Sequence, residues 1–133
     1  MPLVRTTGVL PEELENIVTQ TIGACIAVHR RLGPGLSETI YQRALMVELK
    51  FHGLAAEFEK PVPVHYRGEL LCNQRIDLVV EDGLIVEVKS VEAIHAVHVA
   101  QAVGYLRLTG LRVALVVNFN VPVLRQGIRR VVL

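Results

Sequence analysis

The sequence predicts a mixed α/β fold in which helices pack on a central sheet, in the order α-α-β-β-β-α-β-β. Two helical patterns of apolar residues precede any strand pattern. Two short runs rich in Ile and Val then flank a three-residue turn, and a third helical pattern leads into another apolar run. The chain has 133 residues, the usual size of one domain, so we expect a single domain over residues 1–133.

The first half of the chain predicts two helices followed by an edge strand. Residues 11–32 carry apolar residues at helical spacing, with Pro11 suited to the first turn. A Gly-Pro-Gly segment ends this helix, and Ser37 can cap a second helix that runs to about His52. Two prolines within residues 55–67 favour an edge strand, or two short ones, over a central strand.

The second half predicts the rest of the sheet and one more helix. A turn of Glu-Asp-Gly joins two apolar runs as a hairpin, and glycine ends the helix that follows them. We expect strands over residues 75–80, 84–89, 112–118 and 129–133, and a helix over residues 94–109.

The composition limits the class of function. Hydrophobic residues make up 51% of the chain and charged residues 20%, which is typical of a globular protein. No apolar run has the length of a membrane span, and the N-terminus lacks the layout of a secretory signal, so we expect a cytoplasmic protein with no membrane partner. The formal net charge of +1 means that any nucleic-acid function depends on the local placement of charge.

Three charged residues stand within the predicted central hairpin. Strand 84–89 is an apolar run that places Glu87 and Lys89 on one face. The neighbouring strand, residues 75–80, is a second apolar run and carries Asp77. Burying an unpaired charge costs several kcal/mol, so such groups are normally paired, bound to a metal or placed at an opening in the sheet.

The register of the hairpin decides whether the two carboxylates meet. A three-residue loop with Gly83 in the left-handed conformation sets Asp77 opposite Glu87. A two-residue turn would set Asp77 opposite Val88 and put the carboxylates on opposite faces. We predict the three-residue loop, because it gives the buried charges a common partner.

Two adjacent carboxylates and a lysine indicate a particular chemistry. The carboxylates repel each other, and a hard divalent cation such as Mg²⁺ or Mn²⁺ is the common remedy. Lys89 would stabilise charge on a phosphoryl group under attack, or position a water whose pKa the metal lowers. The pattern predicts hydrolysis of phosphodiesters. The residues leave open an ordinary Asp-Lys-Glu ion-pair cluster at the end of a sheet.

Two further motifs accompany this D…ExK signature. Residues 35–41, GLSETIY, match the pattern GxxExxY, and Gln101 and Tyr105 match the pattern QxxxY. With these motifs the sequence resembles the GxxExxY proteins of the PD-(D/E)XK nuclease-like superfamily, over about residues 22–133.

The resemblance implies both a fold and a set of roles. The fold is a restriction-endonuclease-like core of helix, three antiparallel strands, helix and parallel strand, with the site where the central strands diverge. Asp77 and Glu87 are expected to bind Mg²⁺, Lys89 to assist attack, and Glu38 to approach from the helix as a further acidic ligand.

The helix after the hairpin contributes the other candidates. Gln101 and Tyr105 lie four residues apart and share a helix face, so we expect Gln101 in the catalytic set and Tyr105 against the substrate. His98 joins that face as a candidate substrate-binding residue, although a lone helical histidine more often packs or donates a hydrogen bond. We interpret Tyr41 as a buried anchor.

The leading hypothesis is a metal-dependent endonuclease whose partner is nucleic acid, with DNA expected before RNA. The alternative is a nuclease-like module that binds nucleic acid or protein without turnover, which the near-neutral charge and low aromatic content favour. The apolar C-terminal residues 131–133 also favour a homodimer that pairs across a two-fold axis.

Overall fold

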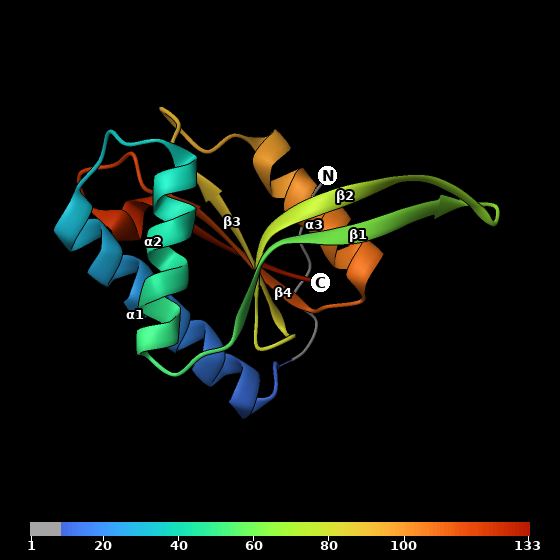
Figure 1. Ribbon diagram of the computed structural model, residues 1–133, viewed down its shortest axis with the longest axis horizontal. Coiled ribbons are helices and arrows are strands. Elements are labelled where there is room, and N and C mark those ends of the chain that lie inside the picture. Colours follow the sequence, from blue (N-terminus) through green and yellow to red (C-terminus); the bar gives the residue numbers. More distant parts are fainter. Residues whose placement is uncertain (1–8) are drawn as a thin grey trace.

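The computed structural model describes residues 9–133. Within these residues, three α-helices and five strands follow one another in the order that the sequence predicts, and a short 3-10 helix that was not predicted precedes the last strand (Figure 1). Their bounds are α1 Glu12–Leu32, α2 Glu38–Phe51, β1 Ala56–Tyr66, β2 Glu69–Val80, β3 Leu84–Lys89, α3 Ala96–Thr109, β4 Val113–Asn118, η1 Leu124–Gly127 and β5 Ile128–Val132.

The strands form one mixed sheet in the order β1-β2-β3-β4-β5. β1, β2 and β3 pair antiparallel, β4 pairs parallel with β3 after the crossover through α3, and β5 returns antiparallel to β4. This is the restriction-endonuclease-like arrangement expected from the sequence. A parallel pair needs such a crossover, which explains why a helix separates β3 from β4.

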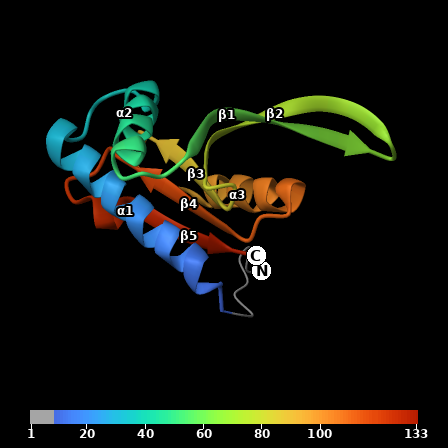
Figure 2. The same cartoon turned by 60° about the horizontal axis from the view of Figure 1, so that its bottom comes forward.

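Helices cover both faces of the sheet (Figure 2). α1 and α2 pack on one face, over a core that includes Leu78, Leu84, Val86 and Leu115. α3 packs on the other face, over a core that includes Val79, Ile85, Ala114 and Val116. Alternating residues of β3 and β4 therefore face different helices, which accounts for their nearly continuous apolar sequence.

The ends of the helices agree with the sequence to within two residues. Ser37 occupies the N-cap position of α2, although its side chain makes no cap hydrogen bond. Gly110 ends α3 in the left-handed conformation, with φ of 74°. Within residues 9–133, none of the helices has the length and apolar character that crossing a membrane requires.

β2 is longer than predicted, because it begins at Glu69 rather than at Arg75. Residues 69–75 are all exposed, so no burial period marks them as a strand in the sequence. They pair with the outer half of β1 in a two-stranded ribbon that projects beyond the body of the molecule (Figures 1 and 2). We call this projecting ribbon, residues 61–75, the arm.

The hairpin between β2 and β3 has the predicted three-residue loop. Val80 pairs with Leu84 and Leu78 with Val86, which is the register that brings Asp77 toward Glu87. The loop is therefore the first determinant of the site.

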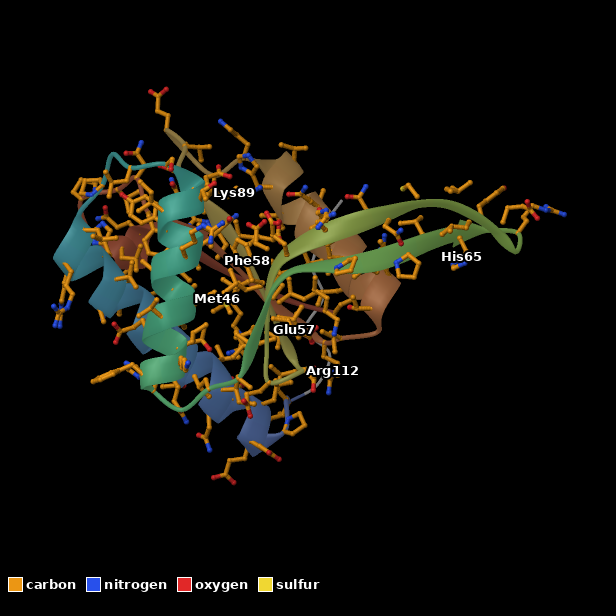
Figure 3. All side chains as sticks on the ribbon, in the orientation of Figure 1. Met46, Glu57, Phe58, His65, Lys89 and Arg112 are labelled. Atoms are coloured by element: carbon orange, nitrogen blue, oxygen red, sulfur yellow. The ribbon has the colours of Figure 1, made fainter. Side chains whose placement is uncertain are left out.

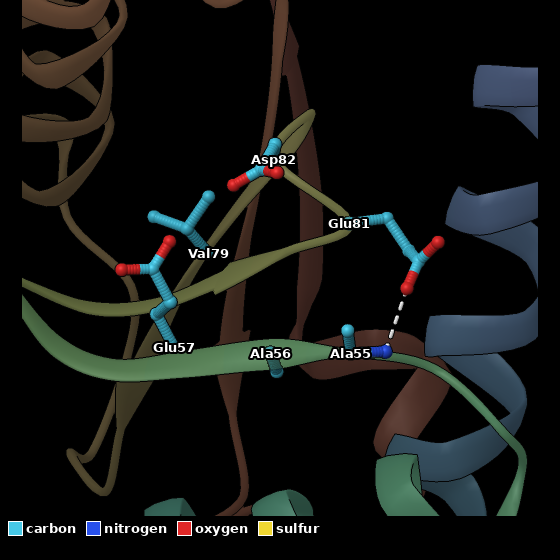
Figure 4. A pocket seen from close by; sticks show the side chains of 6 residues that line it. All are labelled: Ala55, Ala56, Glu57, Val79, Glu81 and Asp82. Atoms are coloured by element: carbon cyan, nitrogen blue, oxygen red, sulfur yellow. Dashed lines mark hydrogen bonds between the residues drawn. The ribbon is translucent and has the colours of Figure 1, made fainter.

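The conformation expected at Gly83 is wrong. Glu81 and Asp82 take the left-handed conformation instead, with φ of 51° and 54°. Space rather than φ limits position 83, because a Cβ there would lie 3.1 Å from Leu14 Cδ1 of α1, and the Leu14 side chain would have to shift slightly. Glu81 also accepts a hydrogen bond of 2.6 Å from the Ala55 N–H, beside a pocket of acidic lining (Figure 4).

Candidate active site

The β2–β3 ladder ends one step before the two carboxylates. Its last pair is Leu78 with Val86. Beyond it, the Asp77 N–H donates to Glu87 Oε2 at 3.1 Å, and the Val88 N–H donates to Asp77 Oδ2 at 2.8 Å. Side-chain oxygens thus take the place of main-chain acceptors where the strands diverge, which is where the resemblance puts the site.

β2 also twists at this point. Leu78 packs in the core beneath α1 and α2, whereas Ile76, two residues away, packs in the core beneath α3. Residues two apart in a regular strand share a face, so β2 turns over at Asp77. Glu59, which lies opposite in β1 between the pairs Phe58–Leu78 and Lys60–Ile76, has φ of 50°. Helices on both sides of the sheet can therefore reach Asp77.

Burial governs the electrostatics of the carboxylate pair. The Glu87 side chain is 2% exposed, and burial, followed by the charge of Asp77, raises its pKa to about 8. Burial also raises the pKa of Asp77, against the opposing effect of its hydrogen bond from Val88. Glu87 therefore holds a proton at neutral pH, and a divalent cation would favour its release.

The charge of Lys89 acts on the pair, and its side chain contacts α3. Its Nζ donates to Gln101 Oε1 at 3.2 Å, and Gln101 Nε2 donates to the Tyr105 hydroxyl at 3.2 Å. Burial raises the pKa of Tyr105, with smaller contributions from the charges of Glu87 and Asp77. Figure 3 shows Lys89 at the end of the sheet between α2 and α3. The structure thus brings together the ExK and QxxxY motifs.

Glu38 approaches from α2 but stands apart from the pair. Its Oε2 accepts a hydrogen bond of 3.3 Å from the Ser90 N–H, just after β3. Its charge contributes to the raised pKa values of Asp77 and Glu87. Among the residues that the structure describes, no group of three or more His, Cys, Asp or Glu side chains is gathered closely enough to hold a metal ion.

The donor set of the pair nevertheless fits a hard divalent cation. Mg²⁺ in proteins commonly takes one or two carboxylates and completes its octahedral shell with waters and substrate phosphates. Asp77 and Glu87 supply two such carboxylates, and burial, the largest cause, raises the pKa of each although the charge of Lys89 opposes the shift. A dedicated cage of protein ligands is not needed for this type of site.

His98 has a structural contact of its own. Its Nδ1 accepts a hydrogen bond of 2.9 Å from the His95 N–H, as part of a capping box at the start of α3. Burial and then the charge of Lys89 lower the pKa of His98, which favours the neutral ring. Its place near the site agrees with the sequence, and a substrate contact stays a prediction.

Tyr41 is buried, as interpreted from the sequence. Its hydroxyl donates to the Gly33 carbonyl and accepts from the Leu36 N–H, and its ring stacks on Phe119 with centroids 4.6 Å apart. Tyr41 thereby fixes the loop that leads into Glu38.

Sequence reasoning missed two polar residues of the site. The Gln42 side chain of α2 lowers the pKa of Asp77, and its spacing of four from Glu38 was the available signal. Asn118, which is 1% exposed at the end of β4, donates to the Val91 carbonyl at 2.9 Å and accepts from its N–H at 3.1 Å. Asn118 thus anchors the segment that follows Lys89.

The acidic pocket of Figure 4 is a separate feature. It lies at the loop end of the β2–β3 hairpin and holds none of the predicted site residues. Its lining consists of Ala55, Ala56, Glu57, Val79, Glu81 and Asp82.

Comparison with known families agrees with the geometry. Residues 15–131 match the family model described as the PD-(D/E)XK nuclease superfamily. A search of curated proteins finds no significant match, and neither does a search of solved structures. The matched segment contains all of the candidate site residues.

Proposed function

The chain belongs to the PD-(D/E)XK nuclease superfamily, and from its site we propose that it is a metal-dependent nuclease that hydrolyses phosphodiester bonds of nucleic acid. The observation that carries the proposal is the buried pair of Asp77 and Glu87 where β2 and β3 diverge. A structural ion-pair cluster would match each carboxylate with a cation, whereas here both carboxylates are held against main-chain N–H groups and have raised pKa values.

The residues of the site divide the work of the reaction. Asp77 and Glu87 would hold Mg²⁺ or Mn²⁺, with Glu38 as a further acidic group at the rim. The bound ion supplies Lewis-acid chemistry and lowers the pKa of water. Lys89, oriented by Gln101, would stabilise negative charge on the phosphoryl oxygens, while Tyr105 and His98 would contact the substrate.

The narrower assignments are part of the same proposal. The motif at residues 35–41 supports membership of the GxxExxY family, and the superfamily supports nucleic acid as partner, with DNA as the expected substrate. We also propose that residues 1–133 form one nuclease-like domain that acts in the cytoplasm.

The homodimer that pairs through the C-terminal residues stays a prediction. Val131 and Val132 are 1% and 3% exposed, so the core of one copy already accounts for their apolar character.

The test compares wild type with Lys89→Ala and with Lys50→Ala, an exposed lysine of α2 outside the site. Each protein is incubated with labelled single-stranded, duplex and branched DNA and with RNA, in Mg²⁺, in Mn²⁺ and in a chelator. We expect metal-dependent cleavage by wild type and Lys50→Ala, and loss of cleavage in Lys89→Ala.

The opposite result favours the alternative function. If the folded wild type cleaves none of these substrates in either metal, the nuclease proposal fails, and a binding module without turnover takes its place. The near-neutral net charge of +1 is the observation that keeps this alternative in view.

A further inference from the structure

The arm presents one free face. On its other face, Val62 of β1 and Ile76 of β2 are buried against α3. The residues that alternate with them in β2, Asn73 and Arg75, therefore point away from α3. Both are exposed. A two-stranded ribbon is marginally stable by itself, and here one face is supported while the other meets solvent.

This free face leads to the catalytic carboxylate. Asn73 and Arg75 lie on the side of β2 opposite Ile76, and this side leads to Asp77, the residue at which β2 turns over. Gln42 of α2 acts on Asp77 from that side, because α2 and α3 cover opposite faces of the sheet. A ligand that lies along this face of the arm would run directly into the site.

The charge of this face suits a polyanion. The residues of β1 that pair with Asn73 and Arg75 are Pro63 and Pro61, so they add no acidic group to this face. Arg67 stands in the turn at the tip with φ of 49°. Neither Arg67 nor Arg75 has an ion-pair partner in the part of the chain that the structure describes. Both guanidinium groups are thus available to phosphate.

The acidic residue of the arm, Glu69, lies at its tip. It pairs with Tyr66 beyond the register shift between Val64 and His65, six residues from Arg75 along β2. Figure 3 shows His65 far out along the arm from Lys89, which indicates how far this face extends from the site. The exposed rings and apolar side chains at the tip, Tyr66, Leu70 and Leu71, lie beside Arg67.

We propose that the free face of the arm is a nucleic-acid track, on which Arg75 and Arg67 bind phosphates of the substrate on one side of the scissile bond. This inference rests on the proposed function and adds to it the surface that holds the substrate. From Glu69 to Asp77, β2 spans about 25 Å, at roughly 3.3 Å per residue. At roughly 3.4 Å per base pair, this length covers about seven base pairs of duplex. A two-stranded ribbon is also narrow enough to enter the major groove.

The test uses Arg75→Ala and the double variant Arg67→Ala/Arg75→Ala, with Arg31→Ala of α1 as a matched control on the exposed end of another element. The side chains of Arg67 and Arg75 form no hydrogen bond or ion pair within residues 9–133, so their removal leaves the fold in place. Cleavage of the preferred substrate is measured over a range of salt concentrations and substrate lengths.

We expect the double variant to raise KM by about tenfold and to leave kcat nearly unchanged, because the arginines contact substrate away from the reacting atoms. The slope of log(kcat/KM) against log of the salt concentration should shrink by about one for each phosphate that the variant no longer binds. Wild type should prefer substrates that extend at least about seven base pairs to one side. The double variant should lose that preference, while Arg31→Ala behaves as wild type.

Several results would overturn the track. If the double variant cleaves with the KM, salt slope and length preference of Arg31→Ala, the arm does not hold substrate. If the variant instead changes the sedimentation coefficient, the arm is an interface between copies of the chain. If no substrate is cleaved at all, the proposed function fails separately. The affinity for labelled nucleic acid, measured in a chelator, then tests the track without cleavage. Weaker binding by the double variant than by wild type supports the track, and equal binding overturns it.

Discussion

The inner half of β2, residues 76–80, and its outer half, residues 69–75, belong to one strand but are held in different ways. Four of the five inner residues are buried in the two cores, and only Asp77 is half-buried. All of the outer residues are exposed, and they pair with β1 alone. Packing therefore holds the inner half and specifies the site, whereas the side chains of the outer half are exposed and can bind a ligand.

The largest expected effect concerns two polar residues of the strand. Asp77→Asn should lower the rate of metal-dependent cleavage by at least about a hundredfold, because the cation loses one of its two buried carboxylates. Mn²⁺ affinity, measured by calorimetry, should fall with it. Asn73→Ala, four residues out on the arm, should keep the metal affinity of wild type. Equal metal affinity in Asp77→Asn and wild type would rule out Asp77 as a ligand.

The second effect compares leucines of the two halves. Leu78 is completely buried, and Leu78→Ala should lower the free energy of unfolding by about 2–5 kcal/mol. Leu71 is 62% exposed, and Leu71→Ala should change the free energy of unfolding by less than about 0.5 kcal/mol. Urea denaturation measures both. A large loss in Leu71→Ala would mean that the arm is packed against a partner in solution.

The third effect follows from the raised pKa of Glu87. Its value of about 8 in the folded protein exceeds the ordinary 4.5, so the folded state favours the protonated carboxyl. The metal-free protein should therefore lose stability as pH rises from about 4.5 toward 8, and Glu87→Gln should lose less. In chelator, between pH 6 and pH 9, we expect wild type to lose ~2 kcal/mol more free energy of unfolding than Glu87→Gln. Parallel stability curves for the two would contradict the raised pKa.

The smallest effect concerns the helix that supports the inner half. Gln101→Ala removes the hydrogen bond that orients Lys89 and should lower kcat by about fivefold, since one such bond contributes about 1 kcal/mol. Metal affinity should stay at the wild-type value. Gln101→Glu, which would form an ion pair with Lys89, should depress kcat further and shift its pH profile. A kcat unaffected by both substitutions would show that Lys89 needs no support from α3.

The sequence predicted the inner half and the carboxylate pair for a physical reason. Burial imposes a period of two on apolar residues, and a charge that interrupts such a run stands out. The register followed because only the three-residue loop brought Asp77 and Glu87 together, and the pairing of Val80 with Leu84 confirms it. Recurrent helix signals, such as Gly110, gave the ends of the helices.

The rest depended on contacts that local patterns do not encode. The outer half of β2 has no buried face to impose a period, so its start at Glu69 was missed. The space at Gly83 is limited by Leu14, which is distant in sequence, and Gly83 itself does not have a positive φ. Gln42 and Asn118 became site residues only when α2 and β4 were placed beside the hairpin.

The position of Asp77 at the root of the arm has a mechanical consequence. The residue that would bind the metal is also the residue at which the ribbon twists out of the body. Swinging of the arm would therefore change the angle between Asp77 and Glu87, and thermal motion of the tip would reach the carboxylates. A substrate long enough to still the arm would give up entropy along its length and gain alignment at the bond to be cut.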